Sequence, residues 1–212
     1  MPLLKGTATF SRYRVEPSGR AVTSTQDKKR PKTDIAKALR LHAFQPLERD
    51  GEDERAQGFV ELADRNRSEF SAGATYQGDF ALFSYRVDEI RIPSAAVRSE
   101  LEAWQQRFVS ENQRPPGKKE KSAAKDEIRH TLKSRYPVAT KTFDVSMNLE
   151  NGHAQLWAGS RKAVDELQDA VEQALGVKLV PVSPLTVAQQ LGIAEKALSP
   201  TPALSMPDGE II

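Results

Sequence analysis

The sequence predicts an α+β protein with mixed or antiparallel sheets, two long central helices and a β-hairpin–helix–strand unit. The hairpin is predicted by strict alternation of apolar and polar residues over 142–149, followed by Asn151 and Gly152, which both tolerate the positive φ of a tight turn. The central helices are predicted by apolar side chains that recur at spacings of three and four residues after Pro93.

The first region, residues 1–92, is expected to be rich in strands. Runs of aromatic and β-branched residues predict the strands, and Pro, Gly and Lys predict a basic loop over 16–32. Thr33 or Asp34 can cap a short helix, since a side-chain oxygen there can accept a backbone N–H of the first turn. The predicted elements are strand 7–15, helix 33–42, strand 58–62 and strand 80–87, which 89–92 continues or pairs with.

Residues 93–137 are expected to form a helical segment. One long helix is predicted over 94–111, and its apolar residues fall on a single buried face: Val97, Leu101, Trp104 and Phe108. The run Arg-Pro-Pro-Gly at 114–117 should break this helix, because proline lacks the N–H that a helix interior needs. A second helix, rich in lysine and arginine, is predicted over 118–135.

Residues 138–184 are expected to form the hairpin–helix–strand unit. The strand over 142–149 should return through 153–158, and Ser160 can cap the helix that follows. Gly176 should end that helix, and 177–182 should form the last strand. Residues 185–212 are predicted to be a mostly disordered tail that begins with a short helix at 186–191.

The composition excludes several classes of protein. The chain has 212 residues and no cysteine, so a disulfide framework, a thiolate metal site and a cysteine nucleophile are all excluded. No stretch approaches the roughly 20 apolar residues that cross a bilayer, and we expect no membrane partner. A reducing, cytoplasmic location is therefore expected.

Charge is distributed unevenly along the chain. The net charge is only +2, but residues 107–141 contain ten Lys/Arg against four Asp/Glu. Within this stretch, one face of the predicted basic helix carries a stripe of cations, and Lys119 and Arg135 add charge beside it. The stripe, spaced by three or four residues, consists of Lys118, Lys121, Lys125, Arg129 and Lys133.

The cationic stripe permits two interpretations from its pattern alone. It is either a solvated face of the helix or a surface that neutralises phosphates and releases their counterions. No aromatic residues are interleaved with it and no base-reading motif is present, so phosphate contact without sequence preference is expected. A protein-interaction module, in which this helix docks onto an acidic partner, is the competing hypothesis.

No catalytic or metal-binding constellation is predicted. The three histidines, His42, His130 and His153, fall in different elements, and the acidic run at 50–54 lacks the alternating ligands of a calcium loop. No phosphate-cradling glycine loop or dinucleotide fingerprint occurs, so no cofactor is expected. The protein is therefore expected not to be an enzyme, with an exonuclease as the third hypothesis.

Several motifs, taken in order, resemble the RdgC family of recombination-associated proteins. The resemblance covers about 35–184 and includes Leu-His-Ala-Phe-Gln-Pro-Leu at 41–47, an Ile-Arg-Ile-Pro strand end at 90–93, Gly-Lys-Lys-Glu-Lys at 117–121 and Leu-Val-Pro-Val at 179–182. It implies a nucleoid-associated protein that binds DNA, mainly duplex, without sequence preference and modulates recombinase filaments. It also implies a homodimer.

The chain is expected to be a short member of this family. Longer members form ring-like dimers around duplex DNA and continue beyond the last strand matched here, in a region that helps to close the ring. An open dimer or a different partner is therefore an alternative to a closed ring. Some descriptions of the family name an exonuclease, but no residues of this sequence predict catalysis.

Overall fold

The computed structural model describes residues 9–17, 31–48, 51 and 53–193. The predicted basic loop falls largely on 18–30, and the predicted tail falls largely on 194–212, so most of both lies outside the described residues. The start of the first predicted strand, at 7–8, also lies outside them.

The strands of the described residues join in one antiparallel sheet. Its order is β2-β4-β5-β6-β1-β7, and β3 pairs with β4 at the side of this path. This arrangement, together with the helices, confirms the predicted α+β class. The strands are β1 (Ser11–Pro17), β2 (Arg55–Val60), β3 (Tyr76–Gln77), β4 (Phe80–Ile90), β5 (Val138–Asn148), β6 (His153–Trp157) and β7 (Val177–Pro181).

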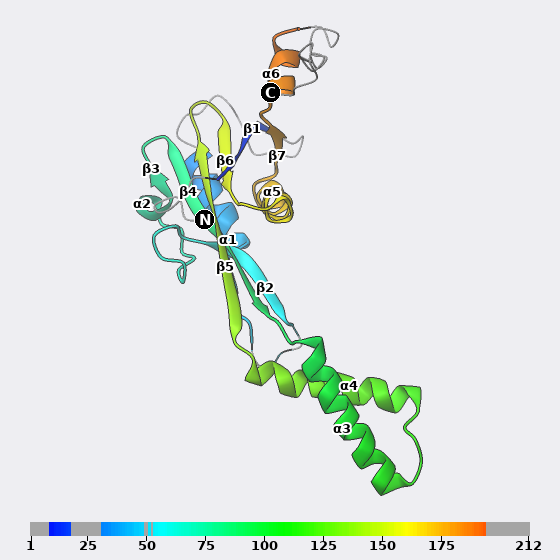
Figure 1. Cartoon of the computed structure of the whole chain (residues 1–212). Coiled ribbons are helices and arrows are strands. Elements are labelled where there is room, and N and C mark those ends of the chain that lie inside the picture. The colour runs from blue at the N-terminus through cyan, green and yellow to red at the C-terminus, as the bar shows by residue number, and fades with distance from the viewer. Residues whose placement is uncertain (1–8, 18–30, 49–50, 52, 194–212) are drawn as a thin grey trace, which may run out of the picture.

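Helices α1, α2 and α5 lie beside the sheet, α3 and α4 form a separate pair, and α6 lies apart from both (Figure 1). The long helices α3 and α4 extend together beyond one end of the sheet, and α6 lies past the end of β7 at the other (Figure 1). The helices are α1 (Pro31–Leu41), α2 (Ala72–Thr75), α3 (Ser94–Asn112), α4 (Lys118–Arg135), α5 (Arg161–Leu175) and α6 (Pro184–Gln190).

The hydrophobic core lies between one face of the sheet and the helices α1 and α5. Leu39 of α1 and Leu167 of α5 are fully buried within it. The ring of Phe59 on β2 packs edge-on against Phe83 and at a tilt against Tyr85, both on β4. Full burial of one such side chain stabilises the fold by roughly 1.5–3 kcal/mol, so this core fixes the sheet on which the other elements are placed.

The strands β4 and β5 connect the core to the helical pair. They pair without interruption from Phe80↔Asn148 to Ile90↔Val138, and their far ends lead directly into α3 and out of α4 (Figure 1). We call α3, α4 and their connection the helical arm, residues 94–135. Because the arm extends past the sheet, most of its surface faces solvent.

The predicted elements that fall on described residues occur in the expected order, but α2 and β3 were not predicted, and there are further local differences. The apolar face of α3 is less buried than predicted. Val97 is buried, but Leu101, Trp104 and Phe108 are only half-buried, because among the described elements α4 is the main one that packs against this helix. The helix ends at Gln113, whose φ of 54° is left-handed, rather than at the following prolines. In the hairpin turn, the positive φ occurs at Gly152 and not at Asn151.

Candidate nucleic-acid interface

The start of α4 is fixed by one carboxylate. Glu120 accepts a hydrogen bond from the backbone N–H of Gly117 at 2.7 Å and two from the guanidinium of Arg114 at 3.0 and 2.6 Å. A glutamate in the first turn also interacts favourably with the positive end of the helix dipole. Hydrogen bonding by Arg114, and then by Gly117, lowers the pKa of Glu120 from 4.5 to about 2.

The N-terminal half of α4 exposes four lysines to solvent. Ala124 and Leu132 are buried and Ile128 is half-buried, so these three side chains form the seam by which the helix packs. Among the described residues, no carboxylate forms an ion pair with any of these lysines. We call them the lysine cluster: Lys118, Lys119, Lys121 and Lys125.

The C-terminal half of the predicted stripe already contacts carboxylates of the same chain. Arg129 donates two hydrogen bonds to Glu54, at 3.0 and 2.7 Å, and this contact raises its pKa. Arg135 lies 3.9 Å from a carboxylate oxygen of Glu100 on α3. Both arginines remain exposed, so each can reach a second anion only in competition with its present partner.

Lys133 is a structural residue in this fold. Its side chain is buried, with the residue only 2% exposed, and its ammonium donates to the carbonyl oxygens of Glu48 at 3.2 Å and Gly51 at 2.7 Å. A buried ammonium is tolerated only where hydrogen bonds replace its hydration. Lys133 therefore attaches the base of the arm to the segment before β2 and is not available to a phosphate in this conformation.

The structure thus divides the sequence-predicted site residues into two groups. The lysine cluster lies together on the projecting part of the arm, and Arg129, Lys133 and Arg135 lie at its base. Sequence periodicity could not show this division, because the partners of the second group come from residues 48–54 and from α3. The role of Arg114 was also missed, although its position six residues before Glu120 is a local signal.

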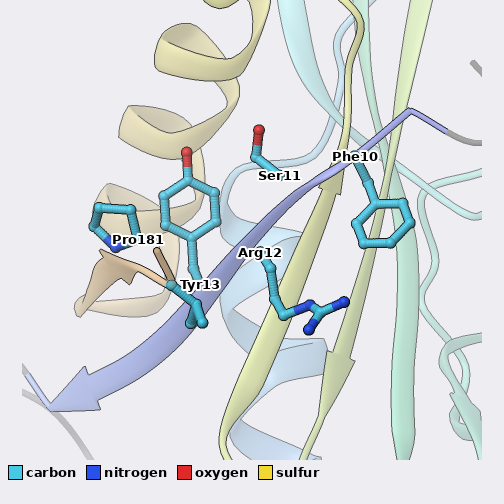
Figure 2. A pocket seen from close by; sticks show the side chains of 6 residues that line it. Phe10, Ser11, Arg12, Tyr13 and Pro181 are labelled. Carbon is cyan, nitrogen blue, oxygen red and sulfur yellow. The ribbon is translucent and has the colours of Figure 1, made fainter. Parts of the chain in front are cut away.

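The sequence did not indicate a second group of neighbouring side chains, which includes two aromatic rings and an arginine. Phe10 and Trp157 pack together with ring centroids 4.8 Å apart, and Arg12 lies 5.9 Å from the centre of the Phe10 ring. Figure 2 shows Phe10 and Arg12 directed to one side of β1, and Tyr13 directed to the other side, near α5. Phe10 and Trp157 are far apart in the sequence, so their contact depends on strand register that the sequence alone did not reveal.

The three histidines lie in different parts of the fold. His42 follows α1, His130 lies on α4 and His153 begins β6. Across the part of the chain that the structure describes, no group of three His, Cys, Asp or Glu side chains is arranged to hold a metal ion. Within the same residues, no helix combines the length and apolar character needed to cross a membrane.

The family model described as "Putative exonuclease, RdgC" matches residues 22–194, which run from before α1 to beyond α6. The chain belongs to the RdgC family. The matched residues include the entire helical arm and every strand except β1. RdgC membership indicates a recombination-related, DNA-associated protein. No curated protein matches the chain.

Proposed function

We propose that this RdgC protein binds DNA without sequence preference, through contacts between the lysine cluster and the phosphate backbone, and acts in recombination or its control. The observation that carries the proposal is the lysine cluster itself: four exposed ammonium groups on one projecting helix end, without carboxylate partners among the described residues. Uncompensated like charges repel one another, and a polyanion relieves that repulsion while releasing condensed counterions.

Salt dependence of binding tests the mode of contact. If four lysines neutralise four phosphates of a duplex, log K should fall with log[salt] at a slope of about −3.6. Duplexes of unrelated sequence should give the same affinity, since phosphate contacts carry no base information. A wild-type protein that does not bind duplex DNA at low salt would refute the proposal.

Charge reversal identifies the surface. The variant Lys118→Glu/Lys121→Glu/Lys125→Glu should lose duplex binding, because it replaces three attractive contacts with repulsive ones. The matched control, Lys37→Glu/Arg40→Glu/Lys162→Glu, makes the same change in net charge at exposed positions of α1 and α5. The control should retain most of the wild-type affinity. Equal loss in both variants would mean that overall charge, rather than the arm, determines binding.

The second candidate function is docking of the arm onto an acidic protein. The Arg129–Glu54 pair favours it, because α4 already binds a carboxylate of its own chain. The two candidates differ in their ligand. Binding to duplex DNA with the expected salt slope supports the first, whereas binding only to an acidic protein surface supports the second.

Catalysis is not part of the proposed function. We propose a binding role, and the family description keeps an exonuclease as the activity to be tested. Duplex DNA labelled at its ends should remain intact when it is incubated with the protein and Mg²⁺ or Mn²⁺. Release of labelled nucleotides that depends on the metal would make the protein a nuclease.

The proposal also includes an oligomeric state and a protein partner. We infer a homodimer that acts on recombinase filaments. Analytical ultracentrifugation over a range of concentrations should show a dimer, and the protein should change the rate at which a recombinase assembles on DNA. A monomer at all concentrations would remove the dimer from the proposal without affecting DNA binding.

A further inference from the structure

Where β6, β1 and β7 lie side by side, their residues that point away from α1 and α5 are exposed or half-buried among the described residues. Alternate residues of β1 point to opposite faces, as strand geometry requires, so Tyr13 and Val15 enter the core while Phe10, Arg12 and Arg14 lie on the other face. Register places Arg12 opposite Gln155 and Arg14 opposite both His153 and Val180. The outward residues of three neighbouring strands therefore form one continuous surface.

Two aromatic rings form one end of this surface. Phe10 is 36% exposed, Trp157 is half-buried, and their planes are inclined by 43°. The indole N–H of Trp157 donates to the hydroxyl of Ser146 on β5 at 3.1 Å, and that hydroxyl donates to Gln155 at 3.0 Å. The Trp157 ring is thus held in a fixed orientation, although it lies on the outside of the sheet.

Cations line the same surface beside the rings. Arg12 is exposed and lies near the Phe10 ring. Arg14 lies two residues further along β1 and forms an ion pair with Glu16. On β7, the exposed Lys178 lies opposite Glu16. Residues two apart on a strand are separated by about 6.6–6.8 Å. Arg12 and Arg14 therefore place two guanidinium groups in succession from the aromatic pair, and Arg14 can bind a phosphate only in competition with Glu16.

A depression runs along this edge of β1. It holds about 440 Å³ and lies at the start of the strand, where residues of both faces line it: Phe10 and Arg12 from the outer face, and Ser11 and Tyr13 from the α5 side, with Pro181 and Val182 (Figure 2). A partly exposed aromatic pair, a guanidinium beside it and further basic side chains along the strands are the chemistry that binds unpaired bases and the phosphates that link them. A duplex does not fit this chemistry, because its bases are already stacked on one another.

We propose that the β6–β1–β7 face binds single-stranded nucleic acid, with a base stacked on Phe10 and Trp157 and the following phosphates on Arg12 and Arg14. This surface is separate from the lysine cluster on α4. Phe10 and Arg12 also precede the residues that the family model matches. The protein would then hold a duplex with its arm and a single strand with its sheet.

Fluorescence of Trp157 tests the proposal directly. The sequence has two tryptophans, so Trp104→Phe leaves Trp157 as the reporter while it retains a ring against Phe108. Titration with oligo(dT) and oligo(rU) of 15 nucleotides should quench Trp157, and the stronger ligand of the two shows whether DNA or RNA is preferred. Phe10→Ala should weaken binding about fivefold or more, and Phe10→Leu should weaken it similarly, because leucine fills the space without offering a π face.

A reciprocal experiment separates this surface from the arm. Arg12→Glu should lose the quenching of Trp157 by oligonucleotides and retain duplex binding, whereas the α4 triple variant should retain the quenching and lose duplex binding. Arg161→Glu makes the same charge change at a side chain that is 94% exposed on α5, and should leave both unaffected. The proposal is overturned if oligonucleotides do not quench Trp157, if Phe10 and Arg12 variants bind them normally, or if those variants change only the oligomeric state.

Discussion

The ammonium of Lys133 donates a hydrogen bond of 2.7 Å to the carbonyl oxygen of Gly51, and this contact joins the base of the helical arm to the segment that precedes β2. The same ammonium also binds the carbonyl oxygen of Glu48. The Arg129–Glu54 pair joins the arm to the same segment. These contacts add to the pairing of β4 with β5 in fixing the base of the arm.

Replacement of Lys133 should weaken the fold more than replacement of an exposed lysine of the same helix. Lys133→Met keeps the aliphatic stem but removes two charge-assisted hydrogen bonds, so we expect a loss of about 1.5–3 kcal/mol in the free energy of unfolding. Lys125→Met is the matched control, with an expected change within about 0.5 kcal/mol because its side chain is exposed. Urea unfolding measures both, and equal changes would contradict a structural role for Lys133.

The Glu120 carboxylate should make stability depend on pH in the acidic range. Its pKa is lowered from 4.5 to about 2 in the folded protein, so the ionised form stabilises the fold fully above pH 4.5. That contribution should be lost as the pH falls from about 4.5 to about 2. Glu120→Gln should therefore be less stable than wild type at pH 6, and the difference should shrink towards pH 2.

Denaturant midpoints at several pH values between 6 and 2 measure this difference. The control is Glu127→Gln, which removes an exposed carboxylate from the same helix without removing a contact at its N-terminus. A difference between Glu120→Gln and wild type that stays constant across the range would exclude the carboxylate as its source.

Gly58 should tolerate no side chain. A Cβ atom at this position would lie 2.4 Å from the Cα atom of Phe44 and 2.5 Å from its backbone nitrogen. Phe44 cannot easily move away, because its N–H donates to the carbonyl oxygen of Phe59 at 2.9 Å. Gly58→Ala should lose about 1–3 kcal/mol of stability or more. Gly73→Ala, whose Cβ would meet no atom within 4 Å, is the control and should change stability by less than about 1 kcal/mol.

The sequence predicts the elements of this fold well where the pattern is local. Alternation over 142–149 and the cap at Ser160 depend on neighbouring residues, and the structure has β5 and α5 at these places. The order of the strands is not local. That β1 lies between β6 and β7 follows from contacts such as Tyr13↔Ala154, which no periodicity reveals.

Prediction of the candidate site from the sequence has the same limit, because local spacing does not determine tertiary contacts. The spacing of Lys118, Lys121 and Lys125 places them on one exposed face, as helical periodicity predicts. The same periodicity extends the stripe to Lys133, yet the loop before β2 covers that end of the helix and buries the lysine. Whether a cation faces solvent depends on tertiary packing, so only the part of the stripe that projects from the body remains a candidate for phosphate contact.

Because Glu54 pairs with Arg129, we predict that Glu54 limits the affinity of the protein for DNA. Glu54 occupies the guanidinium of Arg129 through two hydrogen bonds, so a phosphate must displace it. Glu54→Gln weakens this competition and should release Arg129 for a further phosphate contact. Duplex affinity should rise at low salt, and the slope of log K against log[salt] should steepen by about 0.9.

Glu127→Gln is the control for this prediction, because it removes one negative charge from α4 without freeing an arginine. It should raise affinity slightly through reduced repulsion, with a smaller effect on the salt slope. Fluorescence anisotropy of a labelled duplex at salt concentrations from 50 to 200 mM, a range over which such contacts weaken strongly, gives both slopes. If the two variants have the same slope, Arg129 does not gain a phosphate when Glu54 is neutralised, and the interface ends at the lysine cluster.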